Sequence, residues 1–315
     1  MKLPEFLHII NTKETVAGCV HFIGVDAIRR GRRKDVNIKL WPDPDINVRK
    51  IRIGNISAIV LSPGGKPDAG RAPGVLWIHG GGYITGLKEM VYMGRAADLV
   101  KKYGVVVVSP GYRLAWREPY PAALNDCYKT LVYMKKHAAE LGIRDDQLMV
   151  GGESAGGGLA AAVCLLARDM KEVNVAFQMT LYPMISNTDT ESSRDNHGRI
   201  WNTRRNHFGW KLYLRGAAGG QVPPYAAPAW ETDLTGLPPA YTFVGDEEPF
   251  YAETLEYVRR LNEAGVTAQA DVYHTNIHAF DMLYPEMEVS RDAIRAFDKQ
   301  FEYALENYFA PQKER

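Results

Sequence analysis

The chain carries Gly152-Glu153-Ser154-Ala155-Gly156, a Gly-x-Ser-x-Gly pattern that lies between a predicted strand and a predicted helix. Residues 147–150 before it form a short, mainly apolar run, and residues 157–167 after it are rich in alanine, which favours a helix. A serine on a tight turn between strand and helix exposes its hydroxyl, and the flanking glycines permit the strained backbone. We therefore predict that Ser154 is a nucleophile. Because the pattern is short, this prediction depends on partners elsewhere in the chain.

The composition is typical of a globular protein. Of the 315 residues, 46% are hydrophobic and 24% are charged, which allows a large core in one α/β domain or in two smaller ones. Lysine and arginine total 38 against 37 acidic residues, and this balance offers no electrostatic basis for binding nucleic acid or an anionic membrane. One basic cluster, residues 29–34, is interpreted as a solvated loop or helix end.

Sequence features that report on the cellular compartment favour the cytoplasm. The N-terminal residues 1–6 lack the apolar core of a secretory signal, and no stretch is long and apolar enough to span a bilayer. The cysteines Cys19, Cys127 and Cys164 are scattered and odd in number, so they resemble neither a disulfide framework nor a metal-ligand spacing. We expect a cytoplasmic protein that does not act at a membrane.

Apolar runs alternate with helical periodicity from about residue 56 onward. Several runs are continuously apolar, as in Val105–Val108, which is typical of strands that are buried on both faces of a mainly parallel sheet. The predicted strands are Ile56–Leu61, Gly74–His79, Val105–Ser109, Leu148–Val150, Ala176–Leu181, Ala240–Val244 and Ala268–Tyr273. The predicted crossover helices are Pro121–Leu141, Ser154–Asp169, Tyr251–Ala264 and Glu286–Tyr308. This alternation predicts an α/β fold with a doubly wound sheet.

Two regions do not follow the alternation. Residues 1–50 are polar and irregular, and residues 187–225 contain Trp201, Phe208, Trp210 and Tyr213 among many charges. A long segment of this kind inside a compact domain is usually a lid or a binding loop. We predict a single domain over residues 1–315, in which both regions form a helical cap over the carboxyl edge of the sheet. The cap aromatics either line a substrate pocket or pack the cap onto the sheet.

A glycine-rich loop, His79-Gly80-Gly81-Gly82, directly follows the predicted strand 74–78. Glycines at this place bring backbone N–H groups close to a ligand, and together with the N–H of Ala155 such groups form an oxyanion hole beside a nucleophile. The alternative is a generic glycine turn or a phosphate loop. A phosphate loop of the Walker type is disfavoured because no Gly-Lys-Ser/Thr follows.

Among the eight histidines, His278 is the best candidate for the general base, because it lies between the last predicted strand and the final helix. His274 is nearby but lies at the strand end, and we expect His79 to organise its own loop. The orienting acid should lie between Ser154 and His278 in the chain. Strand 240–244 is followed by three carboxylates, Asp246, Glu247 and Glu248, and this reasoning leaves the choice among them open.

These motifs together resemble the hormone-sensitive-lipase-like group of α/β-hydrolase esterases, also called bacterial family IV, over roughly residues 70–285. The matching stretches are His79–Tyr83, Tyr112–Ala115, Pro119–Ala123, Gly152–Gly158, Asp233–Ala240 and His278–Phe280. The resemblance implies an α/β-hydrolase fold with Ser154 as nucleophile and His278 as base. It places the oxyanion donors at Gly81, Gly82 and Ala155.

In the family, the triad acid is usually an aspartate that immediately precedes the proline of this loop. Here that position, before Pro249, is occupied by Glu248. The resemblance therefore implies a Ser154-Glu248-His278 triad, with Asp246 as the alternative acid. The chain also departs from the family at Gly111, where an aspartate is typical, and at Trp116-Arg117, where Pro-Glu is usual. These changes lie in a supporting loop and affect its hydrogen bonding and the shape of the pocket.

The predicted activity is hydrolysis of short-chain acyl esters through an acyl-enzyme intermediate. The expected substrates are small molecules, and the reaction requires no cofactor or metal ion. The arginines Arg204 and Arg205 in the predicted cap argue against a long lipid channel. Alternatives are an amidase or peptidase of the same fold and a catalytically silent small-molecule-binding relative. Similar proteins commonly dimerise through an exposed sheet edge, so a homodimer is among the expectations.

Overall fold

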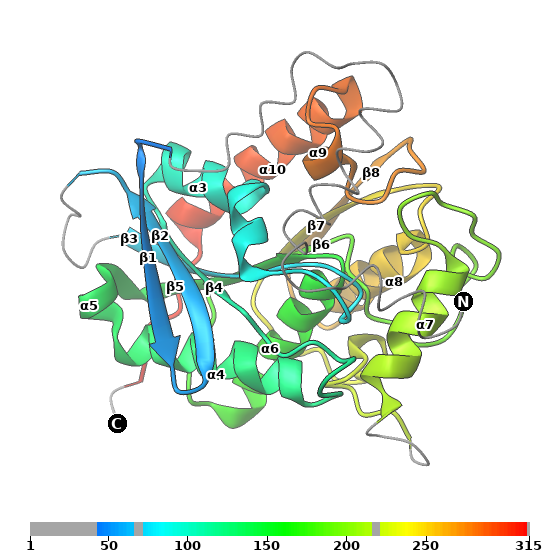
Figure 1. The fold of residues 1–315 in the computed structure, drawn as a ribbon, viewed down its shortest axis with the longest axis horizontal. Helices are drawn as coiled ribbons and strands as arrows, with labels where there is room; N and C mark the ends of the chain where they lie inside the picture. Colours follow the sequence, from blue (N-terminus) through cyan, green and yellow to red (C-terminus); the bar gives the residue numbers. More distant parts are fainter. Residues whose placement is uncertain (1–42, 66–71, 216–220, 314–315) are drawn as a thin grey trace. The chain divides into compact units, whose positions relative to one another are not determined.

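The computed structural model describes residues 43–65, 72–215 and 221–313. Within them one sheet has the strand order β1-β2-β4-β3-β5-β6-β7-β8 (Figure 1). The strands are β1 (Ile46–Ile53), β2 (Ile56–Pro63), β3 (Ala72–Ile78), β4 (Val106–Pro110), β5 (Ile143–Glu153), β6 (Phe177–Leu181), β7 (Ala240–Gly245) and β8 (Ala268–Tyr273). β2 pairs antiparallel with β1 and β4, whereas all neighbours from β4 to β8 pair in parallel. The predicted doubly wound sheet is confirmed.

Helices cover both faces of the sheet. The described helices are α3 (Arg95–Tyr103), α4 (Ala122–Lys136), α5 (Ala138–Leu141), α6 (Ala155–Met170), α7 (Thr203–Tyr213), α8 (Tyr251–Glu263), α9 (Phe280–Leu283) and α10 (Glu288–Asn307), with 3₁₀ turns η1 (Lys88–Tyr92) and η3 (Pro228–Trp230). Helices α3 and α10 lie on one face, and α4 and α6 on the other (Figure 1). None of the described helices has the length and apolar character that crossing a membrane requires.

The central strands are buried on both faces, which explains why their sequences do not alternate. All of β4 is buried, as the run of valines predicts. On the α10 face, Trp77 of β3 meets Phe297 edge-on, with ring centroids 6.5 Å apart. A Cβ on Gly151 would lie 2.6 Å from the Trp77 ring, so the neighbouring strand must carry a glycine where the indole passes. Small and large residues thus interlock across adjacent strands.

The N-terminal part of the sheet differs from the sequence prediction. Residues 46–50, assigned above to the cap, belong to strand β1, which forms a hairpin with β2 around Gly54 at φ +59°. Strand β1 lies at the edge of the sheet, and most of its residues are exposed or partly exposed. Because the strand contains charged residues and no continuous apolar run, the sequence pattern did not predict it. Residues 1–42 of the predicted N-terminal cap lie outside the described residues.

Candidate active site

Ser154 occupies a strained turn at the carboxyl end of strand β5. Its φ of +58° and ψ of −120° lie outside the conformations that side-chain-bearing residues normally adopt, and helix α6 begins at the next residue. The flanking glycines are sterically required. A Cβ at Gly152 would lie 2.5 Å from the carbonyl oxygen of Ile78, and one at Gly156 would lie 2.0 Å from the same atom. The turn therefore packs against the end of strand β3 more closely than any side chain allows.

Both backbone polar groups of Ser154 are hydrogen-bonded to residues 181–184, at the end of strand β6 and in the segment after it. Its N–H donates to the carbonyl oxygen of Leu181, at the end of β6, at 3.0 Å. Its own carbonyl oxygen accepts from the N–H groups of Met184 and Gly158, each at 3.0 Å. These bonds offset part of the cost of the unfavourable φ and fix the direction of the side chain.

Ser154, His278 and Glu248 form one hydrogen-bonded chain. The Nε2 of His278 lies 2.8 Å from Oγ of Ser154, and its Nδ1 lies 2.5 Å from Oε2 of Glu248. All three residues are buried, and Glu248 has no exposed surface. Because a carboxylate only accepts, Nδ1 carries the proton, and in the neutral imidazole Nε2 is left to accept from the serine hydroxyl. A base in this tautomer can remove the hydroxyl proton.

The structure brings Glu248, and not Asp246, against the histidine. The other carboxylate oxygen of Glu248 accepts from the N–H of Gly245 at 2.6 Å. Asp246 is instead bonded to Nδ1 of His274 at 3.0 Å and to the N–H of Thr275 at 3.2 Å. This contact raises the pKa of His274 above its ordinary value, chiefly through the hydrogen bond. Glu247 is exposed. Asp246 thus braces a neighbouring turn and does not reach His278.

Two aromatic rings hold the imidazole of His278 in place. Tyr182 contacts it edge-on at 5.1 Å between centroids, and Phe250 does the same at 5.0 Å. Both rings are fully buried. Such contacts restrict ring rotation without adding hydrogen bonds that would compete with Ser154 or Glu248.

The glycine loop after β3 is organised by His79, as expected. The Nδ1–H of His79 donates to the carbonyl oxygen of Gly80 at 2.8 Å, and its ring stacks on Tyr112 at 4.2 Å. Burial lowers the pKa of His79 to about 4, so this ring is neutral at physiological pH. The hydroxyl of Tyr112 donates a hydrogen bond to the backbone carbonyl oxygen of His79 at 2.9 Å. In the same supporting loop, Arg113 donates to both carboxylate oxygens of Asp126 at 2.8 Å.

The glycine loop passes close to Ser154 and contains backbone N–H groups that have no acceptor among the described residues. Gly81 and Gly82 have φ of +121° and +59°, and the N–H of each donates to no residue of the described part of the chain. A Cβ on Gly80 would lie 3.3 Å from Cβ of Ser154, which shows how closely the loop approaches the turn. Ala155 is the first residue of α6, where N–H groups have no acceptor within the helix. These three N–H groups are available to a negatively charged ligand atom.

Residues 187–215 pack over the glycine loop. A Cβ on Gly82 would lie 2.1 Å from the Trp201 ring, so this indole lies directly against the loop. Tyr213 stacks on Tyr83 at 4.0 Å, and Trp210 contacts the same ring at 5.2 Å. Trp210 and Tyr213 are buried and serve packing, whereas Trp201 and Phe208 retain partial exposure.

Sequence reasoning missed a buried acid next to Ser154. Glu153 accepts a hydrogen bond from Nε1 of Trp77 at 2.9 Å, and burial raises the pKa of its carboxyl to about 8. Close by, the buried Asp281 accepts from the hydroxyl of Tyr182 at 2.9 Å and pairs with Arg95 at 3.4 Å. The only sequence signal was a charged residue in the variable position of the serine motif. Among the described residues no group of three or more His, Cys, Asp or Glu side chains is arranged to hold a metal ion.

Comparison with known proteins gives consistent matches. Residues 75–282 match the model of a family described as having the alpha/beta hydrolase fold. The esterase LipI of Mycobacterium tuberculosis is 29% identical over 264 residues, which cover 82% of this chain and 81% of LipI. The arylesterase of Saccharolobus solfataricus is 30% identical over 253 residues, or 79% and 77% of the two chains. Among solved structures, a bacterial heroin esterase superposes with a TM-score of 0.79 at 31% identity, over 91% of this chain and 90% of that one.

Proposed function

The chain belongs to the hormone-sensitive-lipase-like α/β-hydrolase esterases, and from this membership we propose that it cleaves short-chain acyl esters with a Ser154-His278-Glu248 triad. Its general activity is that of a carboxylesterase of the serine-hydrolase type. The observation that carries the finer proposal is the continuous hydrogen-bonded chain from Oγ of Ser154 through His278 to Glu248.

The reaction follows from the tautomer of His278 that its hydrogen bonds to Ser154 and Glu248 favour. His278 removes the proton from Ser154 as its oxygen attacks the ester carbonyl carbon, and Glu248 stabilises the imidazolium that results. The same imidazolium then protonates the leaving alcohol, which leaves the acyl group on Ser154. In the second half, His278 takes a proton from water as the water oxygen attacks the acyl carbon, and the imidazolium then returns that proton to Oγ of Ser154 as the bond to the acyl carbon breaks and the acid is released.

The oxyanion of each tetrahedral intermediate is proposed to accept from the N–H groups of Gly81, Gly82 and Ala155. Support comes from the close approach of the adjacent Gly80 to Ser154, from the place of Ala155 next to Ser154 in the chain, and from the lack of any described acceptor for the two glycines. Donors fixed in the backbone need no rearrangement when the charge develops, and losing one costs about 3–4 kcal/mol of barrier. The mechanism needs no metal ion or organic cofactor.

The preference for short acyl chains is supported by the packing over the glycine loop. Trp201 lies against Gly82, and Trp210 and Tyr213 fill the space behind Tyr83. Bulky side chains this close to the proposed oxyanion site leave little length for an acyl chain.

The proposal is tested with Ser154→Ala and a fluorophosphonate probe. We expect the probe to label Ser154 in the native protein and not after heat denaturation, and the variant to keep its fold by circular dichroism while losing turnover of p-nitrophenyl butyrate. Retained esterase activity in clean Ser154→Ala would contradict the proposal. Acetyl, butyryl and octanoyl esters measure chain preference. Faster turnover of a p-nitroanilide than of the matching ester would favour the amidase alternative, and a failure of the native protein to react with the probe would favour a silent binding protein.

A further inference from the structure

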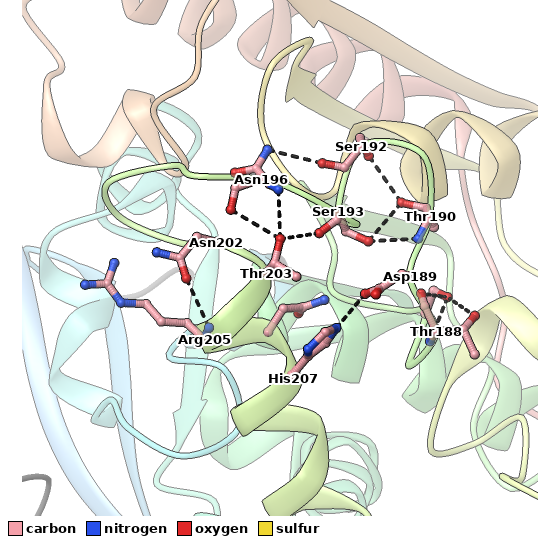
Figure 2. Close-up of polar contacts among 12 residues, drawn as sticks. Thr188, Asp189, Thr190, Ser192, Ser193, Asn196, Asn202, Thr203, Arg205 and His207 are labelled. Carbon is pink, nitrogen blue, oxygen red and sulfur yellow. Dashed lines mark hydrogen bonds and ion pairs between the residues drawn. The ribbon is translucent and has the colours of Figure 1, made fainter. Parts of the chain in front are cut away.

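The segment 188–207 forms a hydrogen-bonded unit that lies beside the loop carrying Glu248. Figure 2 shows Ser192, Ser193, Asn196 and Thr203 linked to one another. The hydroxyl of Thr203 donates to the carbonyl oxygen of Ser193 at 2.6 Å and accepts from the N–H of Asn196 at 2.8 Å. Hydrogen bonds within the segment therefore fix its conformation, in addition to its contacts with neighbouring loops.

Two side chains of this unit reach the acid loop, residues 245–252. The hydroxyl of Ser192 donates to the carbonyl oxygen of Pro249 at 2.9 Å and accepts from the N–H of Ala252 at 3.0 Å. The Nδ2 of Asn196 donates to the carbonyl oxygen of Glu247 at 3.1 Å. The carbonyls immediately before and after Glu248 are thus both held from outside the loop.

The orientation of the Asn196 amide is set by its oxygen. Its Oδ1 accepts from the N–H of Gly198 at 2.8 Å, and its Nδ2 also donates to the carbonyl of Ser192 at 3.1 Å. With the oxygen fixed in this way, the NH₂ group faces the acid loop. Asn196 acts there as a donor, a role that neither alanine nor aspartate can fill.

Within the acid loop the N–H of Gly245 makes a short bond to Oε1 of Glu248, at 2.6 Å, but the backbone N–H groups of Glu247 and Glu248 themselves make only long bonds. The N–H of Glu248 donates to the carbonyl of Gly245 at 3.3 Å, and the N–H of Glu247 donates to that of Thr275, also at 3.3 Å. Both bonds are longer than usual for N–H···O, and Pro249 has no N–H to contribute. The contacts from Ser192 and Asn196 are shorter, between 2.9 and 3.1 Å.

We propose that Ser192 and Asn196 are positioning residues that keep Glu248 within hydrogen-bonding distance of His278. This inference rests on the triad proposed above. Neither residue is expected to touch substrate. Their effect passes through the backbone on either side of Glu248, and small displacements of a catalytic group are costly to rate.

The test is a double-mutant cycle with hydrolysis of p-nitrophenyl butyrate as the readout. Ser192→Ala and Asn196→Asp are each made in the native chain and in Glu248→Ala. Aspartate keeps the oxygen that accepts from Gly198 but removes the donor to Glu247. We expect each substitution to lower kcat about tenfold in the native chain, with KM changed less than twofold, and to cause no further loss in Glu248→Ala. Ser192→Thr keeps the hydroxyl and should restore most of the rate.

Asn202→Ala is the matched control within the same segment. Asn202 caps helix α7 by accepting from the N–H of Arg205 at 3.1 Å, and within the described part of the chain it makes no hydrogen bond to the acid loop. We expect this variant to lower the melting temperature without changing kcat. Ser154→Ala sets the background rate in all measurements.

The outcomes separate the two proposals. If Glu248→Ala keeps the native kcat, the proposed triad is wrong. If Glu248→Ala loses activity while Ser192→Ala and Asn196→Asp keep theirs, the triad stands and the positioning role is wrong. An equal loss from Asn196→Asp in both backgrounds would also overturn the positioning role, because the effect would then not pass through Glu248. Should Asn196→Asp fail to fold, the Ser192 pair of variants decides the question.

Discussion

Nε1 of Trp77 donates to Oε1 of Glu153 at 2.9 Å, in the interior of the protein and one residue before Ser154. Desolvation raises the pKa of this carboxyl from 4.5 to about 8, so it is largely protonated in the folded protein at neutral pH. A Cβ on Gly94 would lie 2.7 Å from the same Oε1, which shows that the backbone of this neighbouring turn closes over the acid. The residue beside the proposed nucleophile therefore contributes a neutral polar group.

Glu153→Gln should remove a pH dependence of stability. Between pH 4.5 and 8 the unfolded chain releases a proton that folded Glu153 keeps, so the free energy of unfolding of the native protein falls as pH rises through this window. Glutamine has no such proton. Relative to the native protein, the variant should gain about 3–4 kcal/mol between pH 5 and pH 8. Urea denaturation at both pH values measures this, with the exposed Glu247→Gln as control. A gain near zero would mean that Glu153 is ionised when folded.

The two candidate acids should differ sharply in their effect on rate. Glu248→Ala leaves His278 without its partner at Nδ1, and we expect kcat/KM for p-nitrophenyl butyrate to fall by roughly a thousandfold or more. Asp246→Ala removes only the contacts to His274 and Thr275 and should cost less than about threefold. Glu248→Asp, one methylene shorter, should give an intermediate rate. The assignment fails if Asp246→Ala alone abolishes activity.

Gly156→Ala should destabilise the protein far more than Gly54→Ala does. The new Cβ at position 156 would lie 2.0 Å from the backbone oxygen of Ile78, which cannot move without disturbing β3. We expect the free energy of unfolding to fall by about 3 kcal/mol or more. At Gly54 no atom lies within 4 Å, so only the positive φ is penalised, at about 1 kcal/mol. Urea denaturation compares them, and equal losses would show that the turn has room to relax.

Trp201→Ala should broaden the range of acyl chains that are accepted. Removing the indole opens space next to Gly82 without touching Ser154, His278 or Glu248. We expect the ratio of kcat/KM for octanoyl over butyryl p-nitrophenyl esters to rise about tenfold. Phe208→Ala, in the same segment, is the comparison variant. An unchanged ratio in Trp201→Ala would show that this ring does not limit chain length.

The sheet could be predicted, and the residues of the proposed triad could be selected, because both steps use local signals in the order of the chain. The continuous apolar runs mark strands buried on two faces, and their carboxyl ends carry the glycine loop, Ser154, Glu248 and His278 in turn. In a parallel sheet these ends share one edge, so residues far apart in sequence are expected to meet there. The resemblance then selected Glu248 among three adjacent carboxylates.

Other features depend on contacts that no local pattern reports. Strand β1 was missed because an edge strand lacks a buried run. The burial of Glu153 depends on Trp77, which lies 76 positions earlier, and the contacts of Ser192 and Asn196 cross to a loop more than fifty positions later. A polar residue in a variable position looks the same in the sequence whether it is solvated or buried. Tertiary packing alone distinguishes these cases.

The anchoring of Ser154 between Leu181 and Met184 bears on how this enzyme can be engineered. Because these hydrogen bonds run to the backbone of residues 181–184, a substitution there leaves the bonding atoms in place, whereas insertions or deletions shift the serine directly. Libraries that aim at new substrates should therefore vary residues but keep the loop length after β6. The segment fixes the backbone of the proposed nucleophile, so its length is a design constraint, and Tyr182 within it should also be kept because its ring contacts His278.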